Sequence, residues 1–126
     1  MLKANHIEWS QGISKGIKIL KKTIQWTKKI IVEAETPSQA KEAAEAGADG
    51  ILLDEMSIQT IEKLVPELRQ LSKTSHSKYV SQNIVIEVSG INPNNLSDYI
   101  FTGIDLISTS APMTKSKWID FSMRFD

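Results

Sequence analysis

Short apolar runs that end in an acidic or small polar residue recur along this sequence, and each is followed by a helix-like segment or by the chain end. The carboxyl ends of parallel strands meet on one face in βα architectures, and functional groups gather on that face. The pattern therefore predicts a parallel α/β fold whose polar strand ends form a site. The residues that end the runs are Glu33, Asp54, Ser89 with Gly90, and Ser108 with Ser110.

Periodicity and turn signals divide the chain into alternating elements. Thr36-Pro37 with Gln39 is typical of a capped helix start, Asn92-Pro93 repeats the signal, and Pro66 is expected to kink the helix that contains it. Residues 72–83 are predicted to form a frayed helix end and a surface loop, residues 111–117 are predicted to be irregular, and the lone His76 is expected at the surface. The expected strands are residues 2–7, 29–35, 50–54, 84–88, 104–109 and a final edge strand at 119–125. The expected helices are residues 10–26, 36–47, 57–71 and 92–103.

Five βα units in 126 residues indicate the α/β class and about half of an eight-stranded barrel, which takes ~250 residues. We expect one α/β domain over residues 1–126, a partial barrel of about five parallel strands. The near-continuous apolar strands indicate a sheet covered on both faces. Two arrangements remain open: a doubly wound open sheet, or a chain whose exposed sheet edges require a partner.

Composition excludes several classes of protein. Fifteen basic residues balance fifteen acidic ones, so net charge favours neither nucleic acid nor membrane as a partner. The absence of cysteine excludes disulfides, thiolate metal sites and a cysteine nucleophile, and it fits a cytoplasmic protein. Six lysines without an acid lie between Glu8 and Glu33. They form either a solvated helix face or a positive field that attracts an anionic substrate.

Several segments together resemble one family, the quinolinate phosphoribosyltransferases, also called nicotinate-nucleotide pyrophosphorylases. The resemblance covers nearly the whole chain and corresponds to the C-terminal barrel portion of such enzymes. The pieces that match its motifs are KANHI at 3–7, IVEAET at 31–36, AEAGADGILLDEMS at 44–57, EVSGIN at 87–92 and TGIDLIS at 102–108.

The resemblance implies an enzyme of NAD biosynthesis that makes nicotinate mononucleotide from quinolinate and phosphoribosyl pyrophosphate with Mg²⁺. It implies catalytic roles for Lys3, Glu33 and Asp54, with the two carboxylates also serving Mg²⁺. Lysine suits anionic substrate groups, and carboxylates suit the positive charge that develops on the sugar. The implied substrate-binding residues are Asn5, His6, Ser89, Gly90, Ile91, Ser108, Ser110 and Ala111, with the 5′-phosphate over the last two strands. Asn5 and His6 are equally consistent with a structural role.

Three departures from the family pattern affect substrate specificity. Ala4 replaces an acidic residue, the glycine pair after Ser89 is reduced to Gly90 alone, and SAPMTK at 110–115 replaces the sequence GALTHS. The TSAP sequence at 109–112 is similar to the molybdenum-transport-associated (ModD) branch of the same superfamily, which is the alternative enzyme class. A half-barrel that serves only assembly is the non-enzymatic alternative.

The family's N-terminal domain and early strands, which carry substrate-binding arginines, have no counterpart in this sequence. Arg69 and Arg124 are its two arginines, and neither lies at a predicted strand end that faces the site. We therefore expect weak activity for the chain alone. Its expected partners are the two substrates and either further copies of itself or a second polypeptide that supplies the absent half.

Overall fold

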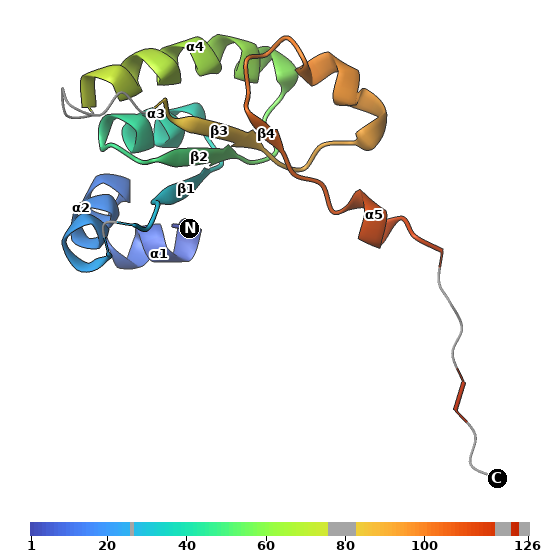
Figure 1. The fold of residues 1–126 in the computed structure, drawn as a ribbon, viewed down its shortest axis with the longest axis horizontal. Coiled ribbons are helices and arrows are strands. Elements are labelled where there is room, and N and C mark those ends of the chain that lie inside the picture. The colour runs from blue at the N-terminus through green and yellow to red at the C-terminus, as the bar shows by residue number, and fades with distance from the viewer. Residues whose placement is uncertain (26, 76–82, 118–121, 124–126) are drawn as a thin grey trace.

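The computed structural model describes residues 1–25, 27–75, 83–117 and 122–123. Their centre is a parallel sheet in which the four strands follow one another in sequence order (Figure 1). Because the order never reverses, the sheet is wound in one direction, as in a barrel, and the doubly wound alternative is wrong. The partial-barrel prediction is confirmed. The strands are β1 (Ile31–Ala34), β2 (Gly50–Leu53), β3 (Val85–Val88) and β4 (Leu106–Ile107).

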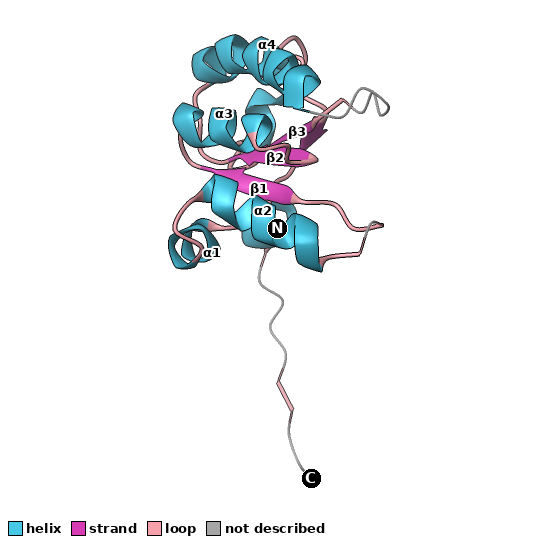
Figure 2. Ribbon diagram, turned by 90° about the vertical axis from the view of Figure 1, so that its left-hand side faces the viewer, coloured by secondary structure: helices cyan, strands magenta, loops and turns pink. Residues whose placement is uncertain are grey.

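The helices of the described chain lie around this sheet. Figure 2 shows α3 and α4 stacked over one face of the sheet, with α2 beside β1. None of these helices is long and apolar enough to cross a membrane, as far as the described residues extend. The elements are α1 (Ala4–Trp9), α2 (Ile13–Thr23), α3 (Pro37–Glu45), α4 (Ile58–Ser75), the 3₁₀ helix η1 (Pro93–Tyr99) and α5 (Ala111–Thr114).

The hydrophobic core lies between the helices and the outer face of the sheet. Alternate strand residues point into it, and all of them are fully buried: Val32, Ala34, Ile51, Leu53, Ile86 and Val88. Helix α3 contributes three fully buried alanines, whose small side chains allow close approach to the strands: Ala40, Ala43 and Ala44. Helix α4 contributes the predicted apolar stripe, of which Ile61 and Leu68 are fully buried.

The opposite, inner face of the sheet is open. Val85 and Leu106 are 42% and 52% exposed, and Ile31 and Glu87 are half-buried. A hollow of about 490 Å³ lies on this face, with Gly50 and Val85 in its wall. The prediction that both sheet faces are covered is therefore wrong for this chain. The strand residues are largely apolar on both faces, but within the described residues the helices pack against the outer face.

The predicted helix signals are confirmed in the structure. Thr36 Oγ1 accepts a hydrogen bond from Gln39 N at 3.3 Å, and Gln39 Oε1 accepts from Thr36 N at 3.2 Å, which completes the capping box. Asn92 Oδ1 accepts from Asn94 N at 3.2 Å at the start of η1. Pro66 lies inside α4, which continues past it to Ser75.

The predicted strand over residues 2–7 is wrong except at its first residue. Leu2 forms one parallel bridge with Val32, and the chain then enters α1. Lys3 is still extended, but its carbonyl accepts from His6 N and Ile7 N at 2.9 and 3.0 Å, so the backbone turns at once. In the part of the chain that the structure describes, the sheet therefore has four strands and one bridge instead of five strands.

Several element boundaries also differ from the sequence-based expectation. Helix α2 begins at Ile13 because Gln11 and Gly12 both have positive φ. Residues 111–114, predicted to be irregular, form α5, and Pro112 fits because it stands in the first turn. Residues 76–82, with His76, lie outside the described residues, as do 118–121 and 124–126. Ser122 and Met123, the described part of the predicted edge strand, form no strand.

Candidate active site

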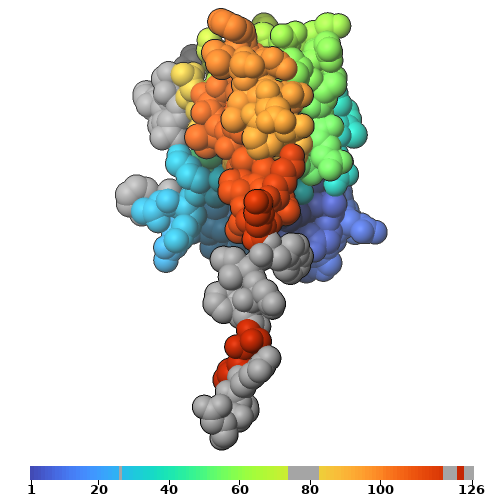
Figure 3. All heavy atoms as spheres, turned by 90° about the vertical axis from the view of Figure 1, so that its right-hand side faces the viewer, coloured from blue at the N-terminus to red at the C-terminus, as the bar shows by residue number. Residues whose placement is uncertain are grey.

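The carboxyl ends of the strands point to the right in Figure 1, and Figure 3 looks onto them. The first group on this face joins the chain start to β1. Glu33 stands on β1, and Lys3 lies next to the bridge that Leu2 makes with that strand. Lys3 Nζ is 2.9 Å from Glu33 Oε2, with side chains that are 57% and 16% exposed. The structure thus brings two of the three predicted catalytic residues into contact.

The electrostatics of Lys3 link all three predicted catalytic residues. The hydrogen bond and the negative charge of Glu33 raise the pKa of Lys3 above its ordinary value, and the charge of Asp54 adds to the rise. Asp54 follows β2, and its backbone N donates to Ala34 O at 3.0 Å. The two carboxylates therefore lie at the ends of neighbouring strands, within electrostatic reach of one ammonium group.

The next contact crosses from β2 to β3. Ser89 Oγ donates to Asp54 Oδ1, and Ser89 N donates to Leu53 O at 3.0 Å. Both side chains are partly buried. Ser89, predicted to bind substrate, therefore directs its hydroxyl proton toward a predicted catalytic carboxylate.

A third carboxylate, Glu87, was missed by the sequence-based prediction. It lies on the inner face of β3, partly buried, and accepts a hydrogen bond from Ser108 Oγ. Leu52 lies between Glu33 and Glu87 in strand register, so the three residues form one row across the sheet. The alternation of side chains along a strand could have identified Glu87. Ile86 and Val88 point into the core, so the residue between them points to the inner face, and that residue is a glutamate.

The predicted phosphate loop after β3 is shaped by one glycine. Gly90 has φ +73°, and a Cβ there would lie 3.3 Å from Glu55 Cγ, so only glycine fits without strain. Glu55 itself has φ +51°. Ile91 is 6% exposed and its side chain belongs to the core, which leaves its backbone as the part that could touch a ligand.

In the second loop, after β4, several donors and acceptors form hydrogen bonds with one another. Ala111 N donates to Thr109 Oγ1 at 3.2 Å, and Pro112 has no N–H to donate. Ser110 O accepts from Met113 N and Thr114 N, each at 2.9 Å. This loop and the chain around η1, coloured orange to red, form the middle of the face in Figure 3.

Asn5 and His6 serve α1 in this structure. His6 Nδ1 accepts from Lys3 N at 3.2 Å, and Asn5 Oδ1 accepts from His6 N at 2.9 Å. Both side chains are exposed. These bonds hold the turn that follows Lys3, so the structural role considered for them is present.

The donor set limits what metal the face could hold. No group of three or more histidine, aspartate or glutamate side chains suited to a metal occurs within the described residues. Glu33 Oε2 is nevertheless a buried oxygen with no hydrogen-bond partner of good geometry, beyond its ion pair with Lys3. Mg²⁺ is commonly held by one or two carboxylates together with substrate phosphates and water. Glu33 and Asp54 fit such an ion.

Comparison with known proteins gives the context for this geometry. Residues 1–124 match the family model described as quinolinate phosphoribosyl transferase, C-terminal domain. The chain is 36% identical over 124 residues to a probable nicotinate-nucleotide pyrophosphorylase (carboxylating) of Methanothermobacter thermautotrophicus, covering 98% of this chain and 42% of that protein. It is 30% identical over 125 residues to the human nicotinate-nucleotide pyrophosphorylase (carboxylating), covering 98% and 39%.

Solved structures agree with the family match. NadC from Streptococcus pyogenes superimposes with a TM-score of 0.75 at 32% identity, over 99% of this chain and 40% of that one. The nicotinate-nucleotide pyrophosphorylase from Francisella tularensis gives a TM-score of 0.70 at 29% identity, over 87% and 35%. The chain thus spans about two fifths of the length of these curated relatives.

Proposed function

This chain belongs to the family of quinolinate phosphoribosyl transferase C-terminal domains, and we propose that it forms part of a site that makes nicotinate mononucleotide for NAD biosynthesis. The proposed substrates are quinolinate and phosphoribosyl pyrophosphate. Carbon 1 of the ribose forms a bond to the pyridine nitrogen as its bond to pyrophosphate breaks. The pyridine loses one carboxylate as carbon dioxide, and the ring carbon that carried it takes up a proton from solvent.

The observation that carries the proposal is the grouping of Lys3, Glu33 and Asp54 at neighbouring strand ends. The ribose carbon becomes positively charged as pyrophosphate leaves, and carboxylates nearby stabilise that charge. The Lys3 ammonium suits the pyrophosphate or a pyridine carboxylate. Lys3 lies more than half exposed, so a ligand can reach it.

We also propose that Glu33 and Asp54 hold Mg²⁺ together with the phosphates of the substrate. The ion would neutralise pyrophosphate charge when bound. Binding it requires Glu33 Oε2 to share or release its ion pair with Lys3, which then faces the anionic substrate. One carboxylate and one lysine would in this way exchange partners when substrate binds.

The 5′-phosphate is proposed to bind over the loops that follow β3 and β4. Ser89 and Ser108 each donate their hydroxyl proton to a carboxylate, Asp54 and Glu87 respectively. A phosphate dianion offers only acceptors, so each serine must turn away from its carboxylate to donate to it. Ala111 N becomes available only if Thr109 Oγ1 releases it.

Completion of the site is proposed to require more polypeptide. The inner sheet face is open, and β3 is the one strand that pairs with β4 among residues 1–25, 27–75, 83–117 and 122–123. A further copy of the chain or a second polypeptide with the absent half of the barrel would cover both. Nucleotide synthesis of this kind would belong in the cytoplasm.

The proposal is tested by the melting temperature of the purified chain with millimolar Mg²⁺ and phosphoribosyl pyrophosphate. A ligand at 100 times its Kd stabilises the folded state by about 2.7 kcal/mol. We expect a clear rise for the natural chain and none for Glu33→Gln or Asp54→Asn. Glu62→Gln, an exposed carboxylate on α4, is the control and should respond like the natural chain.

Nicotinate mononucleotide formation is measured on the same samples. If the natural chain forms nicotinate mononucleotide and the Glu33→Gln variant does not, these strand ends suffice for catalysis. A natural chain that the ligand does not stabilise at all would refute the proposed site and favour a half-barrel that serves assembly.

A further inference from the structure

A Gly-x-Asp sequence occurs at the amino end of two strands, opposite the strand ends that form the candidate active site. Gly47-Ala48-Asp49 leads into β2, and Gly103-Ile104-Asp105 leads into β4. Both glycines have φ +79°, in the left-handed region that favours glycine. The sequence motifs of the family resemblance contain both aspartates, but the proposed chemistry uses neither.

Each aspartate makes the same pair of bonds with the preceding strand. Asp49 N donates to Ile30 O, and Asp49 Oδ2 accepts from Ile30 N, both at 2.8 Å. Asp105 N donates to Ile86 O at 2.9 Å, and Asp105 Oδ2 accepts from Ile86 N at 2.7 Å. Both pairs span 19 residues. We call each of these pairs a strand clamp.

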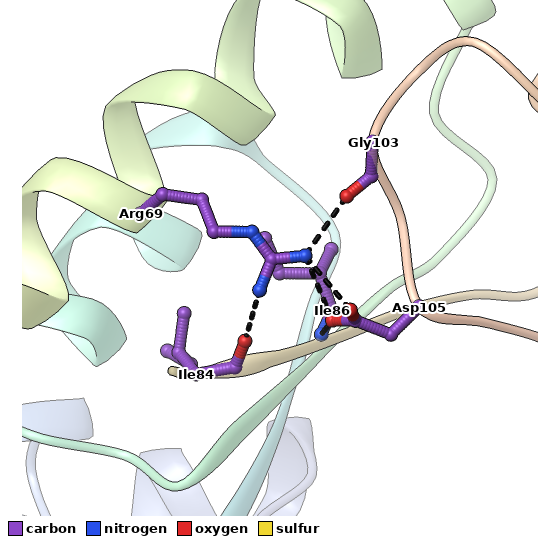
Figure 4. A network of polar contacts seen from close by, with 5 residues as sticks. All are labelled: Arg69, Ile84, Ile86, Gly103 and Asp105. Carbon is purple, nitrogen blue, oxygen red and sulfur yellow. Dashed lines mark hydrogen bonds and ion pairs between the residues drawn. The ribbon is translucent and has the colours of Figure 1, made fainter. Parts of the chain in front are cut away.

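The second strand clamp carries an extra connection through Arg69 of α4 (Figure 4). Arg69 Nη2 lies 2.9 Å from both carboxylate oxygens of Asp105 and donates to Gly103 O at 2.8 Å. Arg69 Nη1 donates to Ile84 O at 2.6 Å. One guanidinium therefore ties α4 to the start of β3 and to the turn before β4. In the first strand clamp the aspartate pairs with a lysine instead of an arginine: Lys29 Nζ lies 3.3 Å from Asp49 Oδ1.

The two strand clamps also act on strand pairs of unequal length. β1 and β2 pair over four residues, whereas β3 and β4 pair over two. β4 is exposed, with Leu106 and Ile107 at 52% and 38%. The β1–β2 register therefore has ladder bonds to fix it without Asp49, and the β3–β4 register depends far more on Asp105.

We propose that Asp105, held by Arg69, is a positioning residue for the candidate active site. It fixes β4 against β3 and thereby places Ser108 beside Glu87 at the other end of the same short strand. This inference rests on the proposed function for its ligand, but the placement of Ser108 can be measured without one. Asp49 is the matched residue whose loss leaves Ser108 where it is.

The test uses Asp105→Asn and Arg69→Lys, with Asp49→Asn as the matched control. Asparagine keeps an oxygen that can accept from Ile86 N but loses the charge that holds Arg69, and lysine cannot reach Ile84 O and Gly103 O together. Amide hydrogen exchange is read at Ser108 N, which donates to Val88 O, and at Asp54 N, which donates to Ala34 O. Binding of phosphoribosyl pyrophosphate with Mg²⁺ is read by calorimetry.

We expect Asp105→Asn and Arg69→Lys to speed exchange at Ser108 about tenfold, with little change at Asp54, and to weaken binding by a similar factor. Asp49→Asn should leave both Ser108 exchange and binding within about twofold. Equal effects of Asp105→Asn and Asp49→Asn on binding would overturn the proposal, as would faster exchange at Ser108 with unchanged affinity. If the natural chain does not bind phosphoribosyl pyrophosphate, the proposed function fails. The role of the second strand clamp is still supported in that case if Ser108 N is protected from exchange in the natural chain and loses protection only in the Asp105 and Arg69 variants.

Discussion

Acidic residues stand at both ends of this sheet, and the two ends hold them in different ways. At the amino ends, Asp49 and Asp105 accept hydrogen bonds from the backbone of the preceding strand. Those backbone donors belong to buried residues, Ile30 and Ile86, which are 4% and 0% exposed. Such donors cannot turn to another acceptor, so these two carboxylates are fixed parts of the fold.

At the carboxyl ends, the acids are held by side chains alone. Glu33 contacts Lys3, and the other two carboxylates accept from Ser89 and Ser108. Each of these partners can rotate toward a ligand without breaking the sheet. The comparison shows that a carboxylate's partners, more than its position beside a strand, distinguish a structural acid from one available for chemistry.

The largest effect should come from Asp105→Ala at the amino end. It leaves Ile86 N buried without an acceptor and Arg69 without its carboxylate, and an unsatisfied buried donor costs about 1–3 kcal/mol. We expect a loss of about 2 kcal/mol in the free energy of unfolding, measured by urea denaturation. Glu87→Ala at the other end is the paired variant. If it costs as much as Asp105→Ala, the distinction between the two ends does not hold.

A smaller effect on stability is expected from Glu33→Gln. The variant removes a contact with a largely exposed lysine, which contributes little to stability, and removes charge from a buried oxygen that no donor besides Lys3 reaches among the described residues. The free energy of unfolding without ligand should therefore change by less than about 1 kcal/mol in either direction. A loss as large as that of Asp105→Ala would make Glu33 a structural acid.

The smallest effect concerns pH and Lys3. Glu33 raises the pKa of Lys3 in the folded chain, chiefly through their hydrogen bond and secondly through its charge. The stability from this pair is therefore fully present below the pKa of an unfolded lysine, about 10.4, and is lost as pH rises through the higher folded value. NMR titration of the Lys3 side chain should show the raised pKa. Glu33→Gln should lower it, and an unchanged pKa in that variant would contradict the contact.

The sequence predicted the alternation of strands and helices because its signals are local. Thr36, Pro37 and Gln39 form a capping box whose partners lie within four residues, and the small face of α3 follows from three alanines at helical spacing. The same holds for Glu33 and Asp54, because each follows an apolar run directly and the parallel order of the strands brings such ends together.

The remaining features depend on contacts between distant residues. KANHI was interpreted as a strand because only the bridge from Leu2 to Val32, and the turn after Lys3, decide where pairing stops. Glu87 was hidden inside an apolar run, and its role depends on Ser108, 21 residues away. Arg69 was discounted because it does not lie at a predicted strand end that faces the site, but it contacts Asp105, 36 residues further along the chain. The strands are apolar on both faces, so their sequence could not indicate which face is packed against helices.

The sequential order of the strands also has a consequence for how the chain acquires its structure. Each of β2, β3 and β4 pairs with the strand that precedes it in the sequence, so no crossover skips a strand. Such a crossover costs less chain entropy to close than one that skips a strand, although parallel pairing remains slow beside a hairpin. Each βα unit can dock as soon as it has been synthesised, on the unit already made. The described strands can therefore assemble in the order of their synthesis, with β4 and its Asp105 contact added after β3.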